Sequence, residues 1–280
     1  MGDQAAAGAP SGRLRDMLTG RAAEELARRP PVKATPVKAT PVDGTPATQP
    51  SVDGTPVERW LVAQWPFVRA HLPAAPASVV EIGCGPDGGL VPLLNHDDYD
   101  AVGIDPEAPD ASGYHRMEFE EYEPPRPVDV VVACRSLHHV ADPAVVLNRV
   151  AATLAPGGVL IVLEWASERF DEPTARWCFD RLGAMGPTAE PSWLHRRRDE
   201  WAAYGRPWPS YRQAWTLREG IHSALEIVRA LDDRFERRAY DTVPYFFGDL
   251  VDTTEADERA AIDSGRIRAT GVRYAATASG

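Results

Sequence analysis

Cysteine and long hydrophobic runs are both scarce in this sequence. Its three cysteines, Cys84, Cys134 and Cys178, are odd in number and lack the spacing of a metal site. We therefore expect reduced thiols and no bound metal. No apolar run approaches the ~18 residues that span a bilayer, and residues 1–10 lack the basic and apolar regions of a signal peptide. These absences predict a cytoplasmic protein without a membrane partner.

Positive charge is in deficit as well. The formal net charge of −11 repels a polyphosphate backbone at long range, so we expect no nucleic-acid partner. With 44% hydrophobic residues among 280, the chain can bury a full-sized core. The composition is rich in arginine and proline but poor in lysine, which suggests a high-GC genome and, by association alone, a role in secondary metabolism.

Residues 1–56 differ in composition from the rest of the chain. Leu14, Met17, Leu18 and Leu26 lie at a spacing that allows a short amphipathic helix. A pentad repeat follows, Pro-Val-Lys-Ala-Thr twice and then Pro-Val-Asp-Gly-Thr, and its regular prolines remove backbone donors. We predict a disordered N-terminal extension that acts as a tether.

The folded domain is expected over residues 57–280, where short apolar runs alternate with helical patterns. Trp60, Leu61 and Trp65 indicate a helix that precedes the first strand. The β-rich runs are residues 78–82, 101–104, 128–134 and 159–164, and residues 143–154 between the last two have helical spacing. This alternation predicts an α/β fold with a doubly wound, mostly parallel sheet.

The alternation stops after the fourth of these runs. Six of the eight tryptophans then follow in a short stretch: Trp165, Trp177, Trp193, Trp201, Trp208 and Trp215. We expect a helical lid inserted at about residues 166–220. A helix at residues 221–231 and two strands, 235–242 and 267–276, complete the domain. Because no strong crossover helix separates these strands, they are expected to form a terminal antiparallel pair.

A glycine-rich turn follows the first β-rich run, in the segment Val79-Val-Glu-Ile-Gly-Cys-Gly-Pro-Asp-Gly-Gly-Leu90. Glycines there let the backbone approach a cofactor closely. Gly83, Gly85 and Gly88 also match the dinucleotide fingerprint, so a nicotinamide or flavin enzyme is an alternative. A pyrophosphate requires a turn without anions, whereas Glu81 flanks this turn and Asp87 is expected at the helix N-terminus. These carboxylates favour a cationic cofactor instead.

An acid ends the second β-rich run, where Asp105 comes 22 residues after Gly83. A carboxylate at this place accepts the ribose hydroxyls of a nucleoside cofactor. Both cofactor classes share this feature. The alternative is that Asp105 only forms a turn before Pro106.

Five segments in this order resemble the class I S-adenosylmethionine-dependent methyltransferases, which have a Rossmann-like fold. They are Glu81-Ile-Gly-Cys-Gly, Val-Gly-Ile-Asp105, Val128-Asp-Val-Val-Val-Ala-Cys134, Ser136-Leu-His-His-Val140 and Leu154-Ala-Pro-Gly-Gly-Val-Leu-Ile-Val-Leu-Glu164. The resemblance is close over residues 79–165 and looser toward the C-terminus. One departure is that Asp87 lies where the family commonly has its third loop glycine.

The resemblance implies a cofactor site for S-adenosylmethionine. Glu81, Gly83 and Gly85 would line the methionine end, and Asp105 would hold the ribose. Glu118 resembles the acid that contacts the adenine amino group, with Phe119 beside the ring; the alternative is a solvated acidic loop. The remaining residues assigned to the cofactor are Cys84, Pro106 and Arg135.

One set of candidates for chemistry follows the third β-rich run and another ends the fourth, at the sheet edge where such folds bind ligands. His138 and His139 can take a proton from an attacking hydroxyl, with His138 favoured; the alternative is a structural histidine that bonds local backbone groups. Glu164 is the second candidate for a base or an acceptor contact.

The inserted stretch permits two interpretations. Tryptophans are most often core residues, but as a group these could roof an apolar acceptor pocket. The basic cluster His195-Arg196-Arg197-Arg198 is expected on a solvated helix face, with binding of an acceptor carboxylate or phosphate as the alternative.

We therefore expect a methyltransferase that uses S-adenosylmethionine and acts on a small-molecule acceptor. Two other classes stay open on sequence alone: an NAD(P)-dependent oxidoreductase, and a catalytically silent cofactor-binding protein that docks through its N-terminal tether.

Overall fold

The computed structural model of this chain describes residues 55–184 and 191–278. The helix and the pentad repeat expected near the N-terminus lie outside these residues. None of the helices in the described part is long and apolar enough to cross a bilayer.

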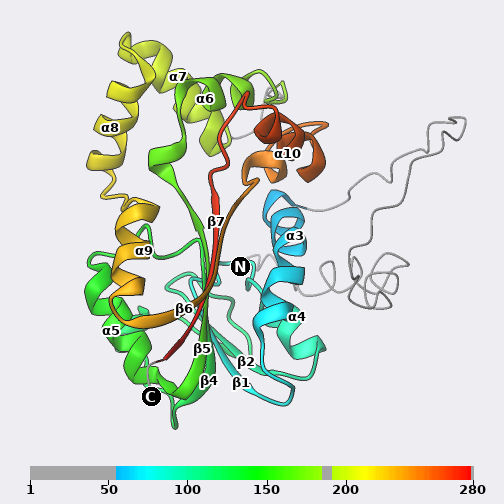
Figure 1. The fold of residues 1–280 in the computed structure, drawn as a ribbon, viewed down its shortest axis with the longest axis vertical. Coiled ribbons are helices and arrows are strands. Elements are labelled where there is room, and N and C mark those ends of the chain that lie inside the picture. Colours follow the sequence, from blue (N-terminus) through cyan, green and yellow to red (C-terminus); the bar gives the residue numbers. More distant parts are fainter. Residues whose placement is uncertain (1–54, 185–190, 279–280) are drawn as a thin grey trace, which may run out of the picture.

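The centre of the molecule is a seven-stranded sheet in the order β3-β2-β1-β4-β5-β7-β6 (Figure 1). Its strands are β1 (Ser78–Ile82), β2 (Asp100–Ile104), β3 (Tyr114–His115), β4 (Val128–Cys134), β5 (Leu154–Trp165), β6 (Phe235–Val243) and β7 (Gly271–Ala278). The first five strands in this order are parallel, and β7 runs antiparallel to both β5 and β6. The predicted mostly parallel sheet with a terminal antiparallel pair is confirmed.

Helices cover both faces of the sheet. On one face lie α3 (Pro56–His71) and α4 (Val91–His96), and on the other lie α5 (Pro143–Thr153) and α9 (Ala224–Asp232) (Figure 1). Because successive strand residues point to opposite faces, Val79 and Val130 pack with the first pair of helices, whereas Val80 and Val131 pack with the second. The central strands are therefore buried on both sides, as their continuous apolar sequences require.

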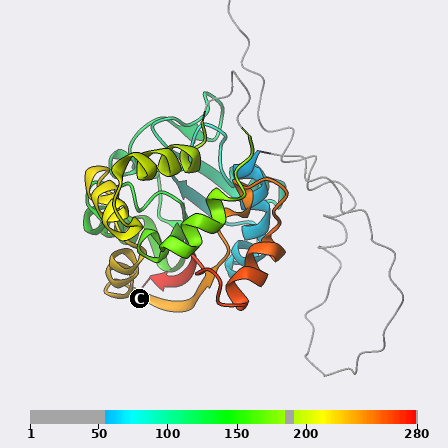
Figure 2. The same cartoon turned by 90° about the horizontal axis from the view of Figure 1, so that it is seen from above.

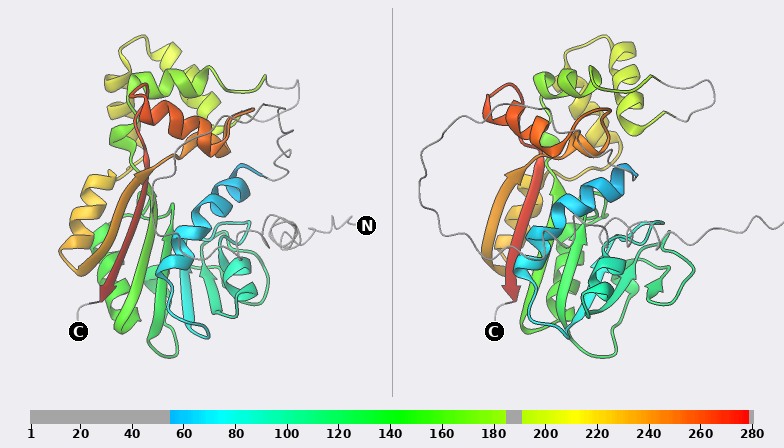
Figure 3. Two further views of the ribbon diagram at one scale, coloured as in Figure 1. Left: turned by 45° about the vertical axis from the view of Figure 1, so that its right-hand side comes forward. Right: turned by 90° about the vertical axis from the view of Figure 1, so that its right-hand side faces the viewer.

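Three further helices lie over the carboxyl ends of the parallel strands (Figures 2 and 3). They are α6 (Glu172–Phe179), α7 (Trp193–Tyr204) and α8 (Trp208–Arg218), which we call the cover. Aromatic side chains join the cover to the sheet, because Trp165 at the end of β5 lies 5.7 Å from Trp215, and Phe170 just after β5 packs edge-on against Trp208 with ring centroids 4.9 Å apart. The cover thus closes the edge at which a ligand site was expected.

The structure also contains elements that the sequence pattern did not predict. These are the short strand β3 and a helix α10 (Glu255–Asp263) between β6 and β7. Helix α10 separates β6 from β7 in the sequence, but it is not a crossover between parallel strands, and β6 and β7 pair antiparallel as predicted. The expected helix at 221–231 begins three residues later, at Ala224, because Ser223 caps it and accepts a hydrogen bond from the Glu226 N–H.

Candidate active site

The glycine-rich turn after β1 is supported from below by Glu81. The Glu81 carboxyl is fully buried, and its Oε2 accepts hydrogen bonds from the N–H groups of Leu90 (2.7 Å) and Val91 (3.1 Å). Burial raises the pKa of Glu81 to about 8, so this group is mostly protonated at neutral pH. It is therefore not the fixed anion that the sequence argument assumed.

Helix α4 begins only at Val91, with Leu90 as its N-cap, so Asp87 is not at a helix N-terminus as expected. Asp87 instead lies in the turn and lines a cavity. The helix is displaced because residues 83–90 form a longer turn, in which Gly83, Gly85 and Gly88 all have positive φ.

Gly83 and Gly85 meet different surroundings. A Cβ added at Gly83 would lie 2.3 Å from the Ser136 Cβ, so the turn packs directly on the segment after β4. A Cβ added at Gly85 would meet no atom within 4 Å, because Gly85 borders open space. Gly85 also donates its N–H to Asp105 Oδ2 (3.0 Å), which holds the turn against the end of β2.

Two adjoining cavities open at this edge of the sheet. The first, of about 500 Å³, we call the tryptophan cavity because Trp165, Trp193 and Trp215 line it. The second, of about 300 Å³, we call the edge cavity because it follows the ends of β1 and β2. Four residues line both of them: Gly83, Asp105, Arg135 and His139.

The structure brings most of the expected cofactor residues to these cavities. Cys84 and Gly85 line the tryptophan cavity, and Pro106, Glu118 and Phe119 line the edge cavity. Glu81 does not line either one; it lies beneath the turn, and its Oε1 has no hydrogen-bond partner. The sequence placed Glu81 at the site, but in the structure it supports the turn that forms the cavity wall and does not face the cavity itself.

Arg135 lies at the junction of the two cavities. It follows β4 directly in the left-handed conformation, with φ of +53°, which is uncommon for a residue other than glycine. Its guanidinium lies 5.1 Å from the centre of the Trp60 ring, and it also contacts the Tyr245 side chain. Arg135 therefore brings a cation to the wall of both cavities.

His138 and Glu164 form a buried pair between the ends of β4 and β5. His138 Nδ1 lies 2.6 Å from Glu164 Oε2, and the two side chains are 7% and 1% exposed. Glu164 also accepts hydrogen bonds from the N–H groups of Leu137 (2.7 Å) and Trp165 (2.9 Å). Burial alone would raise the pKa of Glu164, but the His138 ring and these two N–H groups together lower it. An ionised Glu164 therefore accepts the proton on Nδ1.

This pairing leaves Nε2 as the ring nitrogen with which His138 can meet a ligand, and His138 lines the tryptophan cavity. His139 lies beside it, with ring centroids 4.1 Å apart. Burial and the neighbouring His138 lower the pKa of His139, so its ring is neutral at physiological pH. Glu164 itself does not line the cavity.

The aromatic stretch divides into two groups. Trp165, Trp193 and Trp215 form the cavity wall, whereas the other three do not line it: Trp177, Trp201 and Trp208. The sequence did not place Tyr245, Ile221 or Val57 at the site, and they join the wall from distant parts of the chain. A single tyrosine after a strand carries no motif, so no sequence pattern could have identified Tyr245.

The expectation of a solvated face for the basic cluster is wrong for two of its members. His195 is 9% exposed and Arg197 is 8% exposed. His195 bonds to Ser192 and to the carbonyl of Gly183, and Arg197 is paired with two glutamates. Arg196 is exposed and lines the tryptophan cavity together with Arg197.

Comparison with known proteins places the chain in context. The sequence model of a family described as "Methyltransferase domain" matches residues 61–243. A ubiquinone biosynthesis O-methyltransferase of Bradyrhizobium sp. (strain ORS 278) is 28% identical over 142 residues, covering 46% of this chain and 53% of the relative. A trans-aconitate 2-methyltransferase of Variovorax paradoxus (strain S110) is 34% identical over 145 residues, covering 48% and 54%. The chain thus spans about half the length of the curated relatives it matches.

Solved structures are similar at low sequence identity. The N-methyltransferase NodS from Bradyrhizobium japonicum WM9, in complex with S-adenosyl-L-homocysteine, is 12% identical with a TM-score of 0.47, covering 96% of this chain and 98% of that one. A geranyl diphosphate C-methyltransferase from Streptomyces coelicolor A3(2) is 16% identical with a TM-score of 0.43, covering 78% and 76%.

Proposed function

We propose that this chain, which belongs to the class I S-adenosylmethionine-dependent methyltransferase family, transfers a methyl group to an oxygen atom of a small-molecule acceptor. The family decides between the two cofactor classes that the glycine turn left open, in favour of S-adenosylmethionine. The names of the relatives support a small acceptor, since both the ubiquinone biosynthesis O-methyltransferase and the trans-aconitate 2-methyltransferase are named for small molecules.

The residues at the two cavities fit this cofactor. The open space beside Gly85 lets the backbone approach a ligand, and Asp105 presents a carboxylate where the cavities meet. We assign the ribose to Asp105 and the adenine to the edge cavity, beside Glu118 and Phe119. Arg135 and the turn residues Gly83, Cys84 and Gly85 would hold the methionine end.

The buried pair of His138 and Glu164 is the observation that carries the choice of oxygen. When bound, S-adenosylmethionine supplies a methyl group on a sulfonium that a nucleophile displaces directly. A neutral hydroxyl becomes a competent nucleophile when a base takes its proton. His138 Nε2 is suited to that role, because Glu164 holds the ring by Nδ1 and stabilises the positive charge that the ring gains.

The cover contributes by excluding water and by aligning the acceptor. Trp165 packs edge-on against the His138 ring, with centroids 6.0 Å apart, so the aromatic wall continues directly into the proposed base. An acceptor held against this wall would present its hydroxyl to Nε2, and such alignment is the larger part of catalysis in direct methyl displacement.

The test is single-turnover transfer of a labelled methyl group to phenols, beginning with catechol, across about pH 5–9. His138→Ala should lower the rate by ~10²–10⁴ while the affinity for S-adenosylhomocysteine is unchanged. His96→Ala is the matched control, because His96 is a surface histidine that pairs with Asp97 and lines neither cavity. A His138→Ala variant with the wild-type rate and pH profile would show that His138 is not the base.

A further inference from the structure

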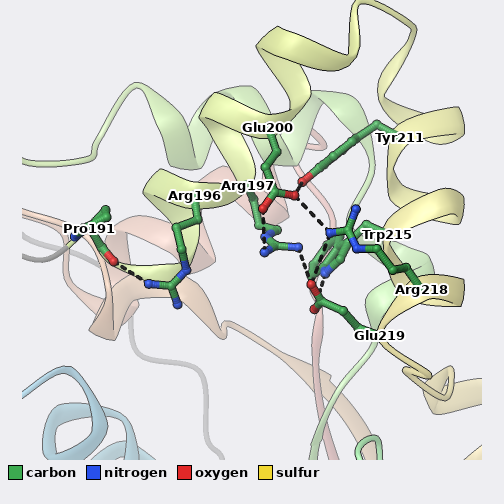
Figure 4. A network of polar contacts seen from close by, with 8 residues as sticks. All are labelled: Pro191, Arg196, Arg197, Glu200, Tyr211, Trp215, Arg218 and Glu219. Carbon is green, nitrogen blue, oxygen red and sulfur yellow. Dashed lines mark hydrogen bonds and ion pairs between the residues drawn. The ribbon is translucent and has the colours of Figure 1, made fainter.

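The cover and the residue that ends α8 place three charged side chains in the wall of the tryptophan cavity: Arg196, Arg197 and Glu219. Arg197 is neutralised by its neighbours. It forms ion pairs with Glu219 (2.8 Å) and Glu200 (3.1 Å), and its guanidinium lies 4.7 Å from the centre of the Trp215 ring (Figure 4). Arg197 therefore holds Trp215 in the wall, and its charge is neutralised by the two glutamates instead of attracting a ligand.

The carboxylate of Glu219 is fully paired within the same network. Besides Arg197, it accepts from the Trp215 indole N–H (2.5 Å) and pairs with Arg218 (3.3 Å), which also pairs with Glu200 (3.1 Å). The two glutamates and the two arginines balance one another. The network shown in Figure 4 is thus a support for the cavity wall, with no net charge to attract a ligand.

Arg196 differs from its neighbour. Within the described ranges 55–184 and 191–278, its guanidinium has one partner, the carbonyl of Pro191 at 2.6 Å (Figure 4). A carbonyl accepts a hydrogen bond but does not neutralise a cation. Among the described residues, no carboxylate pairs with Arg196, so it brings a positive charge to the cavity on the side formed by the cover.

The wall between Arg196 and the proposed base is aromatic. Trp165 lies 5.6 Å from Trp193, 5.7 Å from Trp215 and 6.1 Å from Tyr245, measured between ring centroids. Planar apolar groups pack well against such walls. A ligand that uses all three features has a hydroxyl for His138, a ring for the tryptophans and an anionic group for Arg196.

We infer that the acceptor is a phenol that carries a carboxylate, and that Arg196 binds the carboxylate. This inference rests on the proposed function, because it describes the acceptor side of the same site. The guanidinium can also bind a carboxylate from a second source, the methionine end of the cofactor. The experiment must therefore separate the two carboxylates.

The experiment measures binding to the full-length chain saturated with S-adenosylhomocysteine, by calorimetry. The probes are 4-hydroxybenzoate and 4-hydroxycinnamate, each compared with its neutral amide of the same shape. The wild type should bind each acid roughly tenfold or more tightly than its amide, as a charge-assisted hydrogen bond implies. Arg196→Met should abolish this preference, and Arg196→Lys should retain part of it.

Arg198→Met is the matched control on the same helix. Arg198 pairs with Asp199 (2.9 Å) and lines a separate groove on the outside of the cover, so its loss should leave the preference intact. Amides that bind as tightly as acids, or the absence of binding by either at millimolar concentration, would overturn the inference. A weaker affinity of Arg196→Met for S-adenosylhomocysteine would also overturn it, because Arg196 would then hold the cofactor. Since binding needs no turnover, the preference for acids can hold even if the proposed methyl transfer fails.

Discussion

At the scale of single residues, the side chains that line the site are held in position by residues that do not line it. Glu164 shows this most clearly, because it accepts three hydrogen bonds and lies behind His138, away from the cavity. The sequence favoured His138 as the base and gave Glu164 as a second candidate, but it did not show that Glu164 supports His138. Whether a carboxylate faces a ligand or supports a histidine depends on packing that no local motif encodes.

Replacing Glu164 by Gln tests this order. The change removes the charge that stabilises a protonated His138 ring, so the rate of methyl transfer should fall roughly 10²-fold or more. Affinity for S-adenosylhomocysteine should be unchanged, because Glu164 does not line either cavity. Single-turnover rates and calorimetry measure the two quantities. Loss of rate in Glu164→Gln but not in His138→Ala would move the base to Glu164.

Residues that carried a motif were easier to place than those that did not. Gly83, Gly85 and Asp105 stand in the expected turn and strand end, since the backbone conformation of the glycines and the side-chain hydrogen bonds of Asp105 constrain the sequence locally. Tyr245 and Arg196 entered the cavity wall only through tertiary packing. Arg196 and Arg197 are adjacent in sequence, yet one is exposed and the other buried, and composition alone predicted one solvated cluster.

At the scale of elements, the predicted strands were close to those observed because they are buried on both faces. The limits of β1 and β4 agree with the sequence patterns, which are continuous and apolar. Helix α10 was missed because its sequence is largely charged residues and alanine, although Thr254 and Asp257 form a capping box that could have indicated it. The strand β5 begins at Leu154, five residues earlier than expected. The prediction began too late because Ala-Pro-Gly-Gly, at the start of this strand, is a sequence typical of a turn.

The turn between β1 and α4 depends on Gly89. This residue has φ of +58°, and an added Cβ would lie 2.4 Å from Glu81 Oε1. Gly157 is the matched control, because it has φ of +74° but open space around it. Gly157→Ala should cost roughly 1–2 kcal/mol for the left-handed backbone, and Gly89→Ala about 1–3 kcal/mol more for the collision. Urea denaturation measures both, and equal losses would show that Glu81 moves aside freely.

At the scale of the whole molecule, two buried carboxyl groups make the free energy of unfolding depend on pH. Burial raises the pKa of Glu81 to about 8 and that of Glu258 to about 7. The folded state therefore keeps protons that the unfolded chain releases above its ordinary pKa of 4.5. Each of these two groups lowers the free energy of unfolding progressively as the pH rises from there to its folded pKa.

Glu81→Gln should remove one of these contributions without breaking the turn. Only Oε2 of Glu81 accepts hydrogen bonds, so the Gln carbonyl can replace it and the amide group can occupy the place of Oε1. Relative to wild type, the variant should gain stability between about pH 4.5 and pH 8, by an amount on the order of a few kcal/mol, and show a constant difference above that range. Urea denaturation at several pH values measures this, and a difference independent of pH would mean that Glu81 is ionised in the folded chain.

The whole fold gathers residues from β1, β2, β4, β5 and the cover at one edge of the sheet, and the central claim is that this edge binds S-adenosylmethionine. Calorimetric titration of the full chain with S-adenosylhomocysteine and with NADH tests it most directly. The account predicts micromolar or tighter binding of S-adenosylhomocysteine, weakened by roughly 1.5–3 kcal/mol in Asp105→Ala because the ribose loses a charged acceptor. Tight binding of NADH with no heat from S-adenosylhomocysteine would contradict it.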